Sequence, residues 1–281
     1  MVAEMARVSQ VVACFRMATV AKRRGPVPVQ SVGRSLDLLD AVGAESVGLV
    51  ALAERTGLGA STAYRLLSTL MEHGYVRRNP ETGHFHVGYK LLDLAARAAH
   101  DTEALRAIVR PHLEAVRNTT DETANLVVPD GLTVVYIDQV ESARAIRMFT
   151  AIGRRVAMHA SASGKAILAF SSKSPLEGRE IVNLEALTSH TLITLDGLAD
   201  DLERTRSRGF AIDSEEYDLG VVCVAAPIIG HNGEPAAALS VSGPSERMRA
   251  ADLDVLGAIV RNQAADASRE LRAENPRLDA V

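Results

Sequence analysis

The sequence has few cysteines, no long apolar run and no strong excess of charge of either sign. Its 281 residues include two cysteines, Cys14 and Cys223, which are too few for a secreted fold that depends on disulfides. No stretch of about 18 uncharged apolar residues exists, so no membrane-spanning helix is expected. The net charge of −4 argues against a protein that coats nucleic acid or a membrane surface, although it is compatible with a local DNA-reading surface.

The content of apolar and charged residues is ordinary for a folded protein. The chain is 47% hydrophobic and 23% charged, which excludes disorder over most of its length. Its length predicts about two domains, each with a buried core. The patterns described below predict a flexible basic arm over residues 1–26, a winged helix-turn-helix domain over 27–90, a linker helix over 91–103, an α+β domain over 104–273 and a tail over 274–281.

The N-terminal arm places a basic cluster, Lys22-Arg23-Arg24, after a short apolar stretch at residues 11–15. A signal peptide has the opposite order, so we do not expect one here. Two interpretations of the arm stay open, a segment that adds contacts to DNA phosphates and a solvated tail. The start of the natural chain, at Met1 or at Met17, also stays open.

Three helical patterns and a hairpin follow the arm. Apolar residues recur at helical spacing over residues 32–42, 50–56 and 63–71, and the third pattern is the clearest. Segments 75–78 and 84–87 alternate around a turn of Asn, Pro and Gly, which predicts two short strands. Two short helices joined by a tight glycine-containing turn are typical of a helix-turn-helix, and a hairpin directly after the third helix is a wing.

The exposed side of the third helix carries the groups that read DNA. Hydroxyl, phenol and guanidinium groups bond base edges and phosphates, and a recognition helix uses mainly its N-terminal residues. Two arginines of the wing and one at the start of the first helix are candidates for backbone contacts. We therefore predict DNA contacts by Arg34, Ser61, Thr62, Tyr64, Arg65, Thr69, Arg77 and Arg78.

The alternative is a winged helix that binds protein. Residues 27–90 carry six basic and six acidic side chains, and this balance weakens the electrostatic case for DNA. Over residues 1–90, however, 11 basic and 7 acidic side chains give a net charge of +4, whereas residues 91–281 carry −8. The whole-chain charge therefore averages a basic end with an acidic remainder, and it is no evidence against DNA binding.

A linker helix is predicted next, with an alanine-rich apolar face over residues 91–99. A second helical pattern runs to residue 116 and contains Pro111, which we expect to kink the helix or to start a new first turn. Small residues on a helix between two domains favour contact with a second copy of the chain, since symmetric operators favour two-fold readers. Packing of this helix against its own domain is the alternative.

Alternation with period two replaces the helical period in the C-terminal part. The expected fold is α+β, with helices packed on an antiparallel sheet. Strands are predicted at residues 124–128, 132–140, 146–150, 210–213, 221–229 and 235–241, and helices at 164–170, 197–208 and 252–272. Turn residues at 130–131 and 230–233 indicate hairpins.

Residues 159–168 combine small residues with the start of an apolar helix, where free N–H groups attract anions. Two catalytic interpretations fail on spacing. A P-loop needs Gly at position 159 and Ser or Thr at 166, and these are His159 and Ala166. A Ser-x-x-Lys nucleophile needs Ser at position 162, where Ala162 stands.

Two further segments could contribute to a site. Residues 213–220 hold four carboxylates without His or Cys at ligand spacing, so no metal is expected. A solvated acidic loop is the simpler interpretation for Glu215, Glu216 and Asp218. Cys223 lies on one predicted strand, and Ser240 and Ser242 share a face of its hairpin partner. This polar face is a candidate wall of a ligand pocket. The alternative is a pair of ordinary strand serines.

Taken in order, these segments resemble the IclR family of bacterial transcriptional regulators over about residues 29–273. The combination of many matches in the right order is far more specific than any one of them. The matching stretches are residues 30–39, 61–70, 159–169, 209–216, 220–227 and 238–244.

The resemblance implies a winged helix-turn-helix followed by a GAF-like effector domain. It implies a cytoplasmic protein that binds palindromic promoter DNA as a dimer or a dimer of dimers. It further implies a small organic-acid effector (a 2-oxo, hydroxy or aromatic acid), with no cofactor, no metal and no enzymatic activity. The family's effector-binding positions correspond to Ala162, Ser163, Asp213, Cys223, Ser240 and Ser242.

Within this set of residues there is an Asp and no Arg. We therefore expect N–H groups and hydroxyls to hold an anionic effector, with Asp213 protonated or accepting from a ligand hydroxyl. One departure from the family is Ala60, where many members carry a basic residue before the Ser-Thr pair. We expect Lys22–Arg24 or the wing to compensate.

An enzyme or a small-molecule sensor without DNA output is the remaining alternative from another class. The polar first turn of the third helix argues against it, because such a surface has no use in an enzyme.

Overall fold

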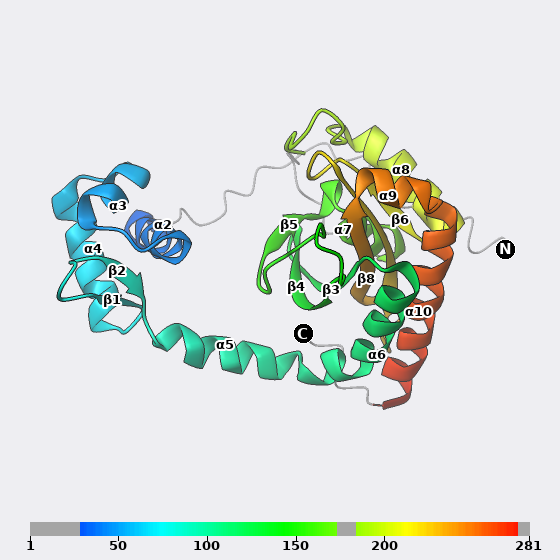
Figure 1. The fold of residues 1–281 in the computed structure, drawn as a ribbon, viewed down its shortest axis with the longest axis horizontal. Helices are drawn as coiled ribbons and strands as arrows, with labels where there is room; N and C mark the ends of the chain where they lie inside the picture. The colour runs from blue at the N-terminus through cyan, green and yellow to red at the C-terminus, as the bar shows by residue number, and fades with distance from the viewer. Residues whose placement is uncertain (1–28, 173–183, 275–281) are drawn as a thin grey trace. The chain divides into compact units, whose positions relative to one another are not determined.

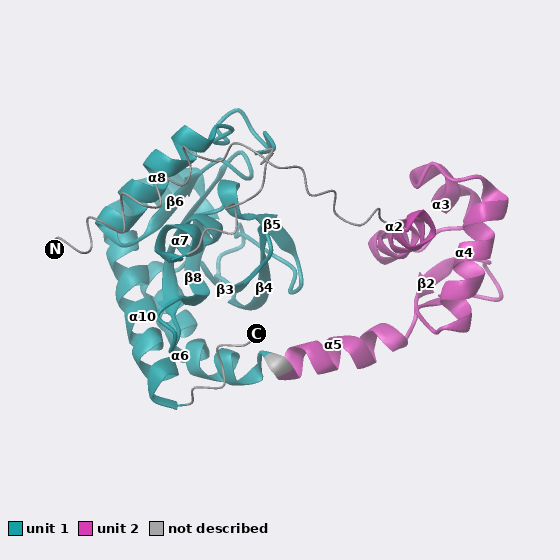
Figure 2. Ribbon diagram, turned by 180° about the vertical axis from the view of Figure 1, so that it is seen from behind, with its two compact units in different colours: residues 1–21, 102–281 teal, residues 22–101 magenta. Residues whose placement is uncertain are grey.

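The structure is a computed structural model that describes residues 29–172 and 184–274. These residues form two compact units, and the boundary between them along the chain lies between residues 101 and 102 (Figure 2). The predicted arm over 1–26, with its choice of start, and the predicted tail beyond residue 274 lie outside the described residues.

The N-terminal unit contains three helices, a two-stranded antiparallel hairpin and a further helix (Figure 1). This order matches the expected winged helix-turn-helix. The elements are α2 (Gln30–Ala44), α3 (Leu49–Arg55), α4 (Ala60–Glu72), β1 (Val76–Arg78), β2 (Phe85–Val87) and α5 (Lys90–Asp101).

The core of this unit is small, and it corrects one part of the predicted pattern. Leu38 and Val42 of α2 are buried, whereas Val32 and Leu36, predicted on the same apolar face, are 56% and 54% exposed. The buried residues of α2 all lie in its second half. Among the described residues of the unit, the first half of the stripe therefore has no covering element. The stripe predicted on α4 packs against the core as expected.

The C-terminal unit contains helices and a six-stranded antiparallel sheet in the order β5-β4-β3-β8-β7-β6. The expected α+β fold is thereby confirmed. Its elements are α6 (Glu103–Thr120), β3 (Thr123–Asp130), β4 (Thr133–Val140), β5 (Arg155–Ala157), the 3-10 turn η1 (Met158–Ala160), α7 (Ala162–Phe170), α8 (Leu195–Arg208), β6 (Ala211–Ser214), β7 (Val221–Ile229), β8 (Pro235–Pro244), α9 (Ser245–Ala250) and α10 (Leu253–Glu274).

The strand predicted at 146–150 is wrong. This segment is irregular, and its Ile146 and Phe149 are 74% and 62% exposed. A strand needs a free sheet edge, and the edge of β4 is taken by β5, which pairs Val135 with Arg155. The segment is instead held by a hydrogen bond from the Thr123 hydroxyl to the Met148 carbonyl, 2.8 Å.

The two faces of the sheet pack against different helices. Val222 and Val224 of β7 belong to the core beneath α6 and α10. Cys223 and Ala225, which alternate with them, pack against Ala162 of α7 on the opposite face. Figures 1 and 2 show α6 and α10 together along one side of the sheet. The alternation therefore fixes which side chains of β7 can reach the start of α7.

The helix around Pro111 was expected either to be kinked or to start a new first turn there. Pro111 lies inside α6, so the helix does not restart at this residue. In the part of the chain that the structure describes, none of the helices combines the length and apolar character needed to cross a membrane.

Candidate functional site

The N-terminal unit presents the predicted recognition residues on the exposed side of α4. Ala63 and Leu67 bury the opposite side of this helix. The side chains of Ser61, Thr62 and Arg65 are exposed. Tyr64 and Thr69, the other predicted residues of α4, are exposed as well. The first two turns of α4 thus offer hydroxyl, phenol and guanidinium groups together, as base and phosphate contacts require. Arg34, on α2, is half-buried.

The two wing arginines are held in place by the hairpin that carries them. Arg77 donates from Nε to the Val87 carbonyl, 3.3 Å, and stacks over the Tyr89 ring at 5.3 Å. Arg78 donates from Nε to the Gly83 carbonyl, 3.0 Å. Both side chains are exposed. The wing therefore presents two exposed positive charges that its own backbone and the Tyr89 ring help to orient.

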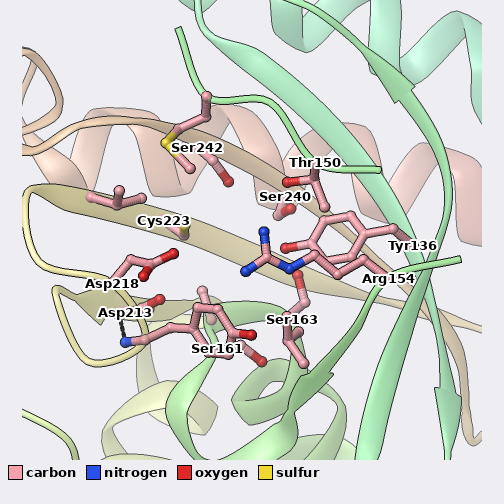
Figure 3. A pocket seen from close by; sticks show the side chains of 15 residues that line it. Tyr136, Thr150, Arg154, Ser161, Ser163, Asp213, Asp218, Cys223, Ser240 and Ser242 are labelled. Carbon is pink, nitrogen blue, oxygen red and sulfur yellow. Dashed lines mark hydrogen bonds between the residues drawn. The ribbon is translucent and has the colours of Figure 1, made fainter. Parts of the chain in front are cut away.

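The C-terminal unit contains a pocket between the start of α7, the strands β6 to β8 and the loop after β6 (Figure 3). All six residues predicted to bind an effector line this single pocket. They are Ala162, Ser163, Asp213, Cys223, Ser240 and Ser242. Their role stays a prediction, but residues as far apart as 162 and 242 are brought together.

Strand register explains this convergence. Asp213 of β6 pairs with Cys223 of β7, and Cys223 pairs with Ser242 of β8. These three residues form one row across the sheet. Ser240 lies opposite Ala225 in the neighbouring row. Since residues two apart share a face, both serines point to the side covered by α7.

The first turn of α7 closes the pocket from the other side. The Ser161 hydroxyl accepts the Gly164 N–H at 3.1 Å and caps the helix. A Cβ at Gly164 would lie 2.3 Å from the Met158 Cα, so only glycine allows this close approach of the helix to η1. The cap and the glycine together hold Ala162 and Ser163 at the edge of the pocket.

Asp213 is a buried carboxyl whose charge depends on pH near neutrality. Its Oδ1 accepts N–H bonds from Glu216 at 2.7 Å and Tyr217 at 3.4 Å. These bonds lower the pKa, but burial outweighs them and raises the pKa of Asp213 to about 7. Burial also raises the pKa of the Cys223 thiol, and the nearby Asp213 adds to the effect. Cys223 is therefore a neutral thiol rather than a nucleophilic thiolate.

A buried ionic cluster anchors the loop beside the pocket. Lys165 of α7 is fully buried, and its Nζ lies 2.5 Å from Glu216 Oε1 and 2.9 Å from Asp201 Oδ2 of α8. The hydroxyl of Thr191 donates to the Glu216 carbonyl at 2.6 Å. The expectation of a solvated acidic loop is thus wrong for Glu216, which is 7% exposed, although it fits the exposed Asp218.

Comparisons with known proteins match both units. The model of the IclR helix-turn-helix domain matches residues 31–80, and that of the bacterial transcriptional regulator IclR C-terminal domain matches residues 97–269. The chain belongs to the IclR family. The acetate operon repressor of Salmonella typhimurium is 40% identical over 238 residues, covering 83% of this chain and 86% of the relative. The transcriptional repressor IclR of Escherichia coli is 38% identical over 251 residues, covering 87% and 91%.

A solved structure supports the same assignment. The crystal structure of the Thermotoga maritima IclR aligns with a TM-score of 0.68 at 32% identity, covering 86% of this chain and 98% of that one. As an IclR-family member, the chain is a transcriptional regulator with a DNA-binding helix-turn-helix and a C-terminal effector domain. These two curated relatives are repressors, which are regulators rather than enzymes.

The sequence reasoning missed several polar residues in or beside the pocket of this IclR domain, among them Asn125 and Arg154. Asn125 is buried in β3, and its Nδ2 donates to Ser242 Oγ at 3.2 Å and lies 3.5 Å from Ser240 Oγ. A lone amide in an apolar strand was the available signal. Arg154 lines the pocket, which corrects the expectation of a site without arginine. Its signal was weaker, because the segment before it was expected to be a strand.

Proposed function

We propose that this IclR-family protein binds promoter DNA through α4 and the wing, and that a small organic acid in the C-terminal pocket changes its DNA affinity. A 2-oxo, hydroxy or aromatic acid is the expected effector. The observation that carries the proposal is the convergence of six polar or small residues from α7, β6, β7 and β8 on one pocket, in a chain whose other unit exposes a polar recognition helix.

The DNA contacts are assigned to residues 27–90 and the effector to residues 104–273. Two copies of the chain, or a dimer of dimers, then bind a palindromic promoter site. The protein acts on this DNA in the bacterial cytoplasm. The exposed apolar side of α5 supports an assembly of copies, since Leu92 is 68% exposed. An effector shifts DNA affinity only through its different affinities for the two states of the protein, typically about 1–3 kcal/mol.

The test is a thermal-shift screen of organic acids, with each hit repeated in a gel shift on the promoter beside the protein's own gene. We expect Ser242→Ala to lose the effector response and to keep its DNA affinity. Ser207→Ala is the matched control, because this serine is exposed on α8 and should change neither property. A normal effector response in Ser242→Ala would show that the site is assigned wrongly. Absence of a promoter shift would favour the protein-binding winged helix.

A further inference from the structure

Arg154 occupies a fixed backbone position at the edge of the pocket. It follows Gly153, whose φ of +87° closes the turn before β5. The Gly153 N–H donates to the Tyr136 carbonyl at 2.8 Å, and the Tyr136 N–H donates to the Arg154 carbonyl at 3.1 Å. These two bonds pin the turn to β4. Figure 3 shows the guanidinium reaching into the middle of the pocket, beside Tyr136.

The guanidinium is also oriented by an aromatic ring. Its central carbon lies 5.5 Å from the centroid of the Tyr217 ring, in the loop after β6. A guanidinium that stacks on a ring keeps its edge N–H groups available, and these groups match a carboxylate in a two-point arrangement. The interaction with Tyr217 raises the pKa of Arg154 further, so the cation persists at every pH at which the protein works.

The charges around the pocket leave this role to Arg154. Among the described residues that line the pocket, Arg154 carries the one permanent positive charge, and Asp213 and Asp218 are acids. Lys165 lies nearby but is already paired with Glu216 and Asp201. Apart from the partial positive charge at the N-terminus of α7, a ligand anion in this pocket therefore meets two acids unless it pairs with Arg154.

We infer that Arg154 binds the anionic group of the effector and makes the pocket select a carboxylate over its neutral counterpart. This inference rests on the proposed function. It places the carboxylate at Arg154 and leaves a hydroxyl or carbonyl of the ligand to Ser240 and Ser242. It also links effector binding to the loop after β6. The ring that stacks on Arg154 belongs to Tyr217 of this loop, and the Tyr217 N–H donates to Asp213.

The experiment compares acids with their amides on the full chain. Isothermal titration with pyruvate, pyruvamide, 4-hydroxybenzoate and 4-hydroxybenzamide is carried out on the wild type and on Arg154→Gln. We expect the wild type to prefer at least one acid over its amide by about 10- to 100-fold, the usual worth of a charge-assisted hydrogen-bonded contact. Arg154→Gln should remove this preference by weakening acid binding, with amide binding nearly unchanged.

The neighbouring arginine supplies the matched control. Arg155 is exposed on β5 and pairs with Asp130, and it does not belong to the residues that line the pocket. Arg155→Gln should therefore keep the preference for the acid. Arg154→Lys should retain part of it, because the charge is kept while the two-point geometry is lost.

The other possible results contradict either the role of Arg154 or the proposed effector class. If acid and amide bind the wild type equally, or if Arg154→Gln keeps the preference, the inference is wrong while the proposed pocket stands. If none of the acids binds the wild type and none of a wider acid screen does, the proposed effector class fails and the inference with it. Should Arg154→Gln not fold, the wild-type comparison and Arg154→Lys decide the question.

Discussion

Asp213 makes the pocket sensitive to pH at the scale of a single residue. Its pKa of about 7 results from burial. Below pH 7 the carboxyl is protonated, so it no longer repels a ligand anion and gains an O–H donor. We therefore predict that pyruvate binds more tightly at pH 6 than at pH 8, with affinity falling by up to about tenfold per pH unit above 7.

The measurement is titration calorimetry at pH 6, 7 and 8, where pyruvate stays ionised. Asp213→Asn is the matched variant, because it keeps an acceptor for the Glu216 N–H and removes the titrating group. Its affinity profile should be flat over this range. The same pH slope in Asp213→Asn would assign the effect to another group. Glu216 in the same loop is a candidate, since burial raises its pKa as well.

Three pocket residues on regular strands could be predicted from the sequence, although Asn125 of β3 was missed. Arg154, which follows an irregular segment, could not be predicted. Cys223, Ser240 and Ser242 lie on strands whose alternation decides the face of each side chain. Arg154 follows a turn whose position depends on which strand takes the edge of β4. That choice is made by long-range pairing, which a local pattern of apolar and polar residues does not contain.

At the scale of elements, the sequence predicted the hairpin of the sheet well. The predicted strand at 221–229 coincides with β7, and the turn at 230–233 sets β8 beside it. The apolar pattern over residues 32–42 predicted burial wrongly in its first half. Val32 and Leu36 follow the helical period, but among the described residues of the unit no element covers them. Periodicity identifies the helix, whereas burial depends on what packs against it.

The buried cluster of Lys165, Glu216 and Asp201 joins three elements, namely α7, the loop after β6 and α8. Removing one partner of a buried ion pair leaves the other charges uncompensated and costs about 3–5 kcal/mol. We predict that Lys165→Met lowers the free energy of unfolding of the C-terminal unit by about this amount. The loss of the loop anchor should also weaken effector binding, because Glu216 donates its N–H to Asp213.

Hydrogen exchange of the β7 and β8 amides in the full chain measures this free energy. Arg144→Met is the control. Arg144 pairs with Asp121 at 2.8 Å, and both side chains are about half exposed, 46% and 52%. An exposed pair contributes less than about 1 kcal/mol. Equal effects of the two substitutions would mean that the cluster contributes no more than a surface pair.

At the scale of the whole molecule, charge and fold divide at nearly the same place. Residues 1–90 carry a net charge of +4 and the remainder −8, and the two compact units meet between residues 101 and 102. The net charge of −4 therefore describes neither unit. The positive end contains the predicted recognition helix and the wing, while the acidic remainder contains the pocket. The anionic ligand proposed for this pocket would need a specific cation, because its surroundings are not generally positive.

The basic arm offers the last prediction, although residues 1–26 lie outside the described residues. Ala60 leaves the recognition helix without a basic residue before Ser61, so phosphate contacts by Lys22, Arg23 and Arg24 would supply what is missing. Each contact contributes about 0.9 to the slope of log affinity against log salt concentration. Deleting residues 1–26 should therefore make this slope less steep by about 3 units for each bound chain and weaken promoter binding at low salt.

A charge-neutral variant separates the charge of the arm from its length. Replacing Lys22, Arg23 and Arg24 together by Gln should reproduce the effect of the deletion on both slope and affinity, because counterion release depends on the neutralised phosphates and not on chain length. Gel shifts at a series of salt concentrations measure both quantities. If slope and affinity stay at the wild-type values in both variants, the arm is a solvated tail, and compensation for Ala60 falls to Arg77 and Arg78 of the wing.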